Sequence, residues 1–332
     1  MSTLGANILT LMDWAKRLDP DGSVPTIVEL LSQTNEILRD MLWKQGNLPT
    51  GERTTVRTGL PTVAWRLLNQ GTSPSKSTTA QIDEGCGTLE AWSEVDVELA
   101  NLNGNQAEFR LSEGMAFIEA MNQEMAQTLF YGNSGTAPEE FLGLSPRYSD
   151  PTATNGSNVI DAGGSGSDNT SIWLVGWGSN SIYGTFPKGS VAGLKHDNYG
   201  EVTVEVTAGI AGNRMRAFQD RWQWKAGIAL KDWRYVCRIG SIDVSNLVGV
   251  TSAADIIELM IKAMYRIPNI SSVKPVFYMN RTCIEMLDIL RRNDVIAGGQ
   301  LSYNIVDGKM EYAFRGIPIR LCDAILETEA LV

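Results

Sequence analysis

The sequence predicts an α+β fold in which helices and strands occupy separate stretches of the chain. Strand-like residues fill 51–99, apolar residues recur at helical spacing through 105–131, and helices alternate with short strands after residue 248. With 332 residues, 43% of them hydrophobic, the chain exceeds the ~150 residues of a typical single domain. The composition is that of an ordinary globular protein with about two cores.

Two amphipathic helices are expected at the N-terminus. Residues 7–18 place an apolar face at helical spacing and end before Pro20; its members are Ile8, Leu11, Met12, Ala15 and Leu18. A second helix is predicted from Thr26, with Glu29 at capping-box spacing, to about residue 45. Helices this short need a surface on which to pack.

Residues 51–99 predict a long β-hairpin with a turn in GTSPSKS. Arms of about 15 residues at ~3.3 Å each would reach on the order of 50 Å from their base. An isolated two-stranded ribbon is marginally stable, and this one carries Val56, Val63, Trp65 and Leu67. The ribbon therefore folds back on its own domain or lies on a neighbouring subunit, and the second alternative is favoured.

The second arm ends in a strict alternation over 94–99. Glu94, Asp96 and Glu98 fall on one face of the predicted strand, and apolar residues fall on the other. The acidic row could dock basic groups of a partner, whereas ordinary surface composition favours a solvated face.

Residues 105–131 predict one long helix, ending at Gly132. At about 1.5 Å per residue it would be roughly 40 Å long. Its apolar stripe is expected to be core, with methionine as filler; the members are Leu111, Met115, Ile118, Met121, Met125 and Leu129.

The remainder alternates between strands and helices after a Gly/Ser/Asn-rich segment at 149–170. Strands are expected in IWLVGWG, SIYGTFP and EVTVEV, and 218–244 predicts two antiparallel strands. Residues 248–332 predict an α+β unit.

The sequence offers little for catalysis, metal or cofactor chemistry. His196 is the only histidine and the four cysteines are far apart without a CxxC pair, so no zinc ligand set is predicted. No P-loop, GxGxxG, GxSxG or HExxH pattern is present. We therefore expect no catalytic residues, no cofactor and no metal, and thus no enzyme. The N-terminus lacks a secretory-signal pattern, no apolar run has the ~20 residues of a membrane span, and reduced thiols fit a cytoplasmic product.

The formal net charge of -10 has the wrong sign for a chain that neutralises phosphates as its main task. One basic and aromatic cluster, around Arg221, Trp222 and Trp224, resembles single-strand binders. Because the two tryptophans share a strand face, packing in a sheet or subunit contact is favoured over nucleic acid.

The order of segments resembles a known family. A helical arm, a long hairpin, an acidic strand, a single long helix ending in FYGN, and then EEFLGLSPRY resemble the major capsid proteins of tailed bacteriophages with the Johnson, or Hong Kong 97-like, fold. IWLVGWGSNSIYGTFPKGSVAGL and WKAGIALKDWRYVCRIGSIDVSNL are similar to the subgroup of certain short-tailed phages, including the Bordetella phage and the epsilon-type Salmonella phages.

The resemblance implies a division of the chain into named parts. It runs 1–48 N-terminal arm, 49–81 E-loop hairpin, 82–150 P-domain with spine helix 106–131, 151–200 loop and first A-domain strands, 201–247 P-domain hairpin, and 248–332 A-domain. Because the hairpin-like stretch 201–245 precedes the A-domain-like stretch, a permuted connectivity of the family architecture is expected.

The function implied is self-assembly into the icosahedral, DNA-containing head of a virion. Partners would be the chain itself, as hexamers and pentamers, a cement or decoration protein, a separate scaffold, a portal, and weakly held double-stranded DNA, with no membrane. The alternatives are an encapsulin-like nanocompartment shell and a two-domain α+β enzyme with an unrecognised site. The residues expected at subunit interfaces are Ile8, Leu11, Trp14, Val56, Arg57, Val63, Trp65, Arg66, Leu67, Glu94, Asp96 and Glu98.

Overall fold

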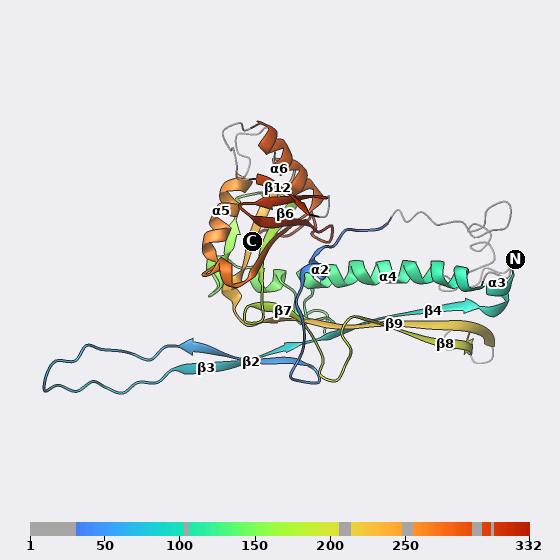
Figure 1. Cartoon of the computed structure of the whole chain (residues 1–332), viewed down its shortest axis with the longest axis horizontal. Helices are drawn as coiled ribbons and strands as arrows, with labels where there is room; N and C mark the ends of the chain where they lie inside the picture. Colours follow the sequence, from blue (N-terminus) through green and yellow to red (C-terminus); the bar gives the residue numbers. More distant parts are fainter. Residues whose placement is uncertain (1–30, 103–105, 206–213, 248–254, 294–300, 307–308) are drawn as a thin grey trace.

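The structure, a computed structural model, describes residues 31–102, 106–205, 214–247, 255–293, 301–306 and 309–332. The predicted helix at 7–18, the start of the second predicted helix, and the interface candidates Ile8, Leu11 and Trp14 lie outside these residues. Figure 1 shows three parts along the molecule: a protruding ribbon, a long helix above a narrow sheet, and a body of sheet and helices.

The ribbon is formed by β2 (Gly51–Gly59) and β3 (Thr78–Gly85), which pair antiparallel from Gly51↔Gly85 outward. It points away from the body (Figure 1). The predicted hairpin is therefore present, but its second arm is shorter than expected. At Cys86 the chain leaves the ribbon, and β4 (Gly87–Asp96) enters a different sheet.

The long helix α4 (Gln106–Tyr131) has the predicted bounds and lies along β4, β9 (Arg214–Leu230) and β8 (Leu194–Glu205) (Figure 1). Strand β9 is the spine of this sheet, with β4 and β8 as its antiparallel neighbours. Its last residues pair with β7 (Ile182–Phe186), so one 17-residue strand joins the narrow sheet to the body.

The body sheet is centred on β6 (Asn169–Trp177), all of whose residues are buried. It pairs with β10 (Val236–Asp243) and β11 (Lys274–Met279). The other strands of the body sheet are β1 (Trp43–Gln45), β5 (Val159–Asp161), β12 (Leu301–Val306), β13 (Lys309–Phe314) and β14 (Ile317–Leu321).

Short helices complete the chain. They are α2 (Ile37–Asp40), α3 (Val97–Asn101), α5 (Ile256–Arg266) and α6 (Arg281–Asn293), with 3₁₀ turns η1 (Ser145–Tyr148), η2 (Gly156–Asn158), η3 (Trp233–Tyr235) and η4 (Ile270–Ser272). One core lies where the end of α4 meets β6, around Phe130, Tyr148 and Trp173. A second core packs α5 and α6 on the sheet around Phe277.

Four local expectations are wrong. Within the described residues 31–45, the second predicted helix is present only as α2, because backbone hydrogen bonds tie Glu36 to Leu321 and Asp323 to Thr34, and β1 joins β7. The strand predicted over 94–99 stops at Asp96, whose carboxylate accepts from the Glu98 amide and caps α3. In both places, specific hydrogen bonds outweigh the helix or strand propensity of the local sequence.

The other two concern packing. The strands predicted within 218–244 exist but do not pair with each other: β9 pairs with β4, β8 and β7, while β10 pairs with β5 and β6. Strand β10 therefore lies in the body sheet, and the assignment of 201–247 to a P-domain hairpin stays a prediction. The helical stripe is core only in its second half, since Met121 and Met125 are buried whereas Met115 is exposed.

Candidate subunit interface

The ribbon is anchored at its base by two carboxylates that lie opposite each other. Glu52 and Glu84 form a cross-strand pair, and both are buried. Like charges opposite each other on adjacent strands destabilise a sheet unless each is compensated. Here each carboxylate has its own set of donors.

Glu84 is held by Arg147 of η1. The guanidinium Nη1 and Nη2 donate to the two carboxylate oxygens at 2.7 and 2.5 Å, and Nη2 and Nε also donate to the carbonyls of Leu142 and Gly143. The ion pair is almost completely buried, with 6% of the Glu84 and 12% of the Arg147 side chain exposed. This two-pronged geometry fixes the direction of β3 as it enters the body.

Glu52 is held by groups from three other segments. The Tyr183 hydroxyl donates to it at 2.9 Å, the Asn47 amide donates at 3.0 Å, and the Lys231 ammonium lies 3.6 Å away. Burial, together with this carboxylate, raises the pKa of the Tyr183 hydroxyl well above its ordinary value. The same two causes raise the pKa of the Cys86 thiol to about 11.

Beyond its base, the ribbon is not covered by any other part of the described chain. From residue 60 to residue 83 every side chain is exposed. Leu60, Val63, Trp65, Leu67 and Leu68 are among the most exposed large apolar residues, and Trp65 is fully exposed. Five exposed large apolar side chains within nine residues are typical of an interaction surface.

The interface candidates on the ribbon share this exposure. Val63, Trp65, Arg66 and Leu67 lie on the outer segment, Arg57 is exposed on β2, and Val56 is partly buried in the ribbon. The structure therefore brings these six residues together on one protruding feature. Their contact with another subunit stays a prediction.

The acidic row is not a continuous surface. Glu94 accepts a hydrogen bond from Gln219 on β9 at 2.8 Å, and the Asp96 carboxylate caps α3. Glu98 belongs to α3 and is exposed. Because the strand ends between them, the three carboxylates no longer share one face, and their docking role stays a prediction.

The Glu84–Arg147 ion pair at the base of the ribbon was not predicted from the sequence, because the two residues are 63 positions apart. The predicted sheet packing of Trp222 and Trp224 is confirmed: Trp222 stacks on Phe117 of α4 with centroids 5.2 Å apart, and Trp224 lies 6.3 Å from Trp43.

Among the described residues, no group of three histidine, cysteine, aspartate or glutamate side chains is placed to hold a metal ion. Within the same residues, no helix has the length and apolar character to cross a membrane.

A family model described as "Major capsid protein GP7" matches residues 19–332. The chain belongs to this capsid protein family. A chain in the solved structure of bacteriophage Epsilon15 is 33% identical, with a TM-score of 0.80, and the match covers 100% of this chain and 99% of that one. None of the curated proteins matches.

Weaker likenesses extend to other shells. The capsid of bacteriophage JBD30 gives a TM-score of 0.45 at 8% identity, covering 89% of this chain and 92% of that one. The SrpI encapsulin of Synechococcus elongatus PCC 7942 gives 0.43 at 12% identity, covering 71% and 97%. The GP7 match and the Epsilon15 likeness confirm the predicted Hong Kong 97-like fold and the function: the chain is a major capsid protein and forms the shell of a tailed-phage virion. They do not favour the encapsulin-like shell or the enzyme.

Proposed function

We propose that the shell is held together by the β2–β3 ribbon, which lies across a neighbouring copy and buries its apolar outer segment there. The observation that carries the proposal is the exposure of Val63, Trp65 and Leu67 on a ribbon whose base is fixed to the body. Burying a side chain of this size contributes about 1.5–3 kcal/mol. Repeated at every contact of a closed shell, such terms are large enough to drive assembly.

In this proposal the protein works mechanically and not as an enzyme. Hexamers and pentamers of the chain close into the icosahedral head, and the exposed Arg57 and Arg66 support contact with individual acidic side chains of a neighbour, such as Glu94, Asp96 and Glu98. A scaffold, a portal and a cement protein are further proposed partners. The net charge of -10 supports weak, non-specific contact with the packaged DNA.

The test compares two charge insertions in the ribbon. Trp65→Glu places a carboxylate where the proposal requires burial, and Thr72→Glu places the same charge in the nearby exposed turn. Each variant is expressed and its particles are counted by electron microscopy after sedimentation. We expect Trp65→Glu to give small oligomers and Thr72→Glu to give closed shells.

The fold of each variant is checked on unassembled subunits. Trp65 is fully exposed in the isolated chain, so its replacement is expected to leave the urea unfolding midpoint unchanged. Closed shells of Trp65→Glu at the yield of the unmodified protein would contradict the proposal. Nuclease-protected DNA in shells made during infection tests the packaging part separately.

A further inference from the structure

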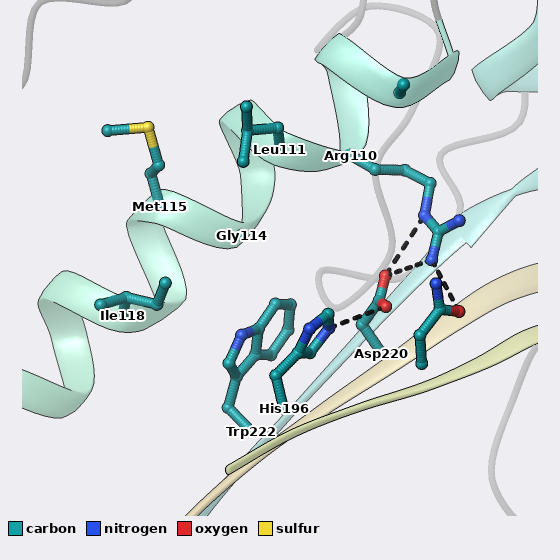
Figure 2. A pocket seen from close by; sticks show the side chains of 10 residues that line it. Arg110, Leu111, Gly114, Met115, Ile118, His196, Asp220 and Trp222 are labelled. Carbon is teal, nitrogen blue, oxygen red and sulfur yellow. Dashed lines mark hydrogen bonds and ion pairs between the residues drawn. The ribbon is translucent and has the colours of Figure 1, made fainter. Parts of the chain in front are cut away.

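A groove lies between α4 and the uncovered part of the narrow sheet. Helix α4 packs on β4 and β9, whereas edge strand β8 has few contacts with it. The groove has a volume of about 340 Å³. Figure 2 shows α4 on one side and the side chains of β8 and β9 on the other. The lining residues used below are Leu111, Met115, Ile118, His196, Asp220 and Trp222.

The helix side of the groove is an apolar stripe that the described part of the chain leaves exposed. Leu111, Met115 and Ile118 follow one another at helical spacing and are 67%, 63% and 45% exposed. In the second half of the same helix, Met121 and Met125 are buried. One apolar stripe therefore runs along the whole helix, but the described residues bury only its second half.

The sheet side is partly apolar, and its side chains are hydrogen-bonded and stacked. His196 stacks on Trp222 with ring centroids 5.0 Å apart, and its Nε2 lies 3.0 Å from Asp220 Oδ1. Arg110 of α4 donates to Asp220 from Nη2 at 2.7 Å and closes one end of the groove (Figure 2). The side chains on this side of the groove thus contact one another directly.

The described chain begins next to this groove. The Gln123 side-chain amide donates to the Leu31 carbonyl at 2.6 Å, and the Gln33 amide donates to Glu119 at 2.9 Å. Glu119 is one helical turn from Met115. The first described residues thus lie over the middle of α4, at the edge of the exposed stripe (Figure 1).

The chain before residue 31 contains a segment that matches the groove. Residues 7–18 carry the apolar face described above, and the ten steps of about 1.5 Å from Ile8 to Leu18 make that face ~15 Å long, against ~10 Å from Leu111 to Ile118. The linker 19–30 spans up to about 40 Å when extended, which is far more than needed. Lys16 and Arg17 are complementary in charge to Glu119 on this half of α4.

We infer that residues 7–18 occupy this groove in their own chain, as an amphipathic helix that covers Leu111, Met115 and Ile118 and completes the layer beside α4. At helical spacing Trp14 falls on the flank of the apolar face, which leaves it available for contact with a neighbouring subunit. The inference does not depend on the role of the ribbon, and it is tested on unassembled subunits.

The first measurement is the rate at which a maleimide labels Met115→Cys in full-length subunits in which Cys86 is replaced by alanine. An exposed reference is Thr72→Cys in the ribbon turn. We expect Met115→Cys to react about tenfold more slowly than this reference, because a docked segment must open first. Adding Leu11→Glu should remove the protection, whereas Thr10→Glu, on the opposite helical face, should keep it.

The second measurement asks which chain supplies the segment. In a Met12→Cys/Met115→Cys double variant, a short flexible bismaleimide should link the two sites within one chain. A mixture of the two single variants should give few links between chains. Links formed only between chains would overturn the inference, as would equal labelling of Met115→Cys and Thr72→Cys. Protection that appears only in assembled shells and survives Leu11→Glu would assign the groove to the ribbon of a second copy.

Discussion

Replacing Arg147 by methionine should loosen the base of the ribbon and destabilise the whole subunit. The substitution keeps an apolar stem but removes four hydrogen bonds, two of them to Glu84. Glu84 would remain 6% exposed, without its cation and opposite Glu52. Breaking one partner of a buried pair costs about 3–5 kcal/mol, a large part of the 5–15 kcal/mol by which a typical protein is stable.

The assay is urea unfolding of unassembled subunits, followed by tryptophan fluorescence. The double variant Arg147→Met/Glu84→Met removes both charges, so it should recover about half of the loss or more. The matched control is Arg53→Met, which breaks the neighbouring pair of the same ribbon. Arg53 and Asp83 are 48% and 53% exposed, so solvent screens their attraction and the unfolding midpoint should stay unchanged.

Two results would refute this reasoning. If Arg147→Met unfolds at the midpoint of the unmodified subunit, the buried pair does not stabilise the base. If the double variant is as unstable as the sum of the two single variants, the cost does not come from an uncompensated buried charge.

Two further predictions concern the same region and the thiols. Gly51→Ala should lower stability by about 3 kcal/mol in the same urea assay, because a Cβ there would lie 1.9 Å from the Glu84 carbonyl oxygen and only backbone could move away; unchanged stability would show that the base is pliable. Burial raises the pKa of the Cys86 thiol to about 11, so only roughly 0.1% is thiolate at pH 8. Alkylation followed by mass spectrometry should then be about 100-fold slower than for a thiol of pKa 9 and should accelerate as the pH rises towards 11. The other thiols, whose pKa values burial raises to about 12, should react more slowly still until the protein is unfolded; they are Cys237, Cys283 and Cys322.

The elements that the sequence predicted well are those whose signal is local and long. Helix α4 follows from an apolar stripe over 26 residues, and the ribbon follows from strand-like residues around a turn cluster. The end of β4 was missed although a local signal exists. Aspartate is a preferred N-cap residue, and the Asp96 carboxylate accepts a hydrogen bond from the Glu98 backbone amide, two residues later. The second predicted helix failed for a different reason: residues near Glu36 bond to residues about 285 positions away, which no local pattern reveals.

The candidate interface divides in the same way. Exposed apolar residues on a ribbon could be predicted, because a two-stranded ribbon has no interior in which to bury them. The Glu84–Arg147 clamp could not, because charged residues in a sequence carry no mark of burial. The exposed half of the α4 stripe was interpreted as core, since periodicity shows that a face is apolar but not which segment covers it.

The two ends of the ribbon therefore do different physical work. At the base, buried charges and a glycine contact fix its direction, and their loss affects the isolated subunit. At the outer end, the apolar side chains are exposed among the described residues, and under the proposed function their loss should affect only the assembled state. If the ribbon makes the proposed contact, a soft base would cost it binding free energy through ordering on contact, so the fixed base would strengthen each subunit contact without adding contact area. Variants at Arg147 should consequently weaken assembly even under conditions in which the subunit itself stays folded, whereas variants at Trp65 should weaken assembly and leave the subunit untouched.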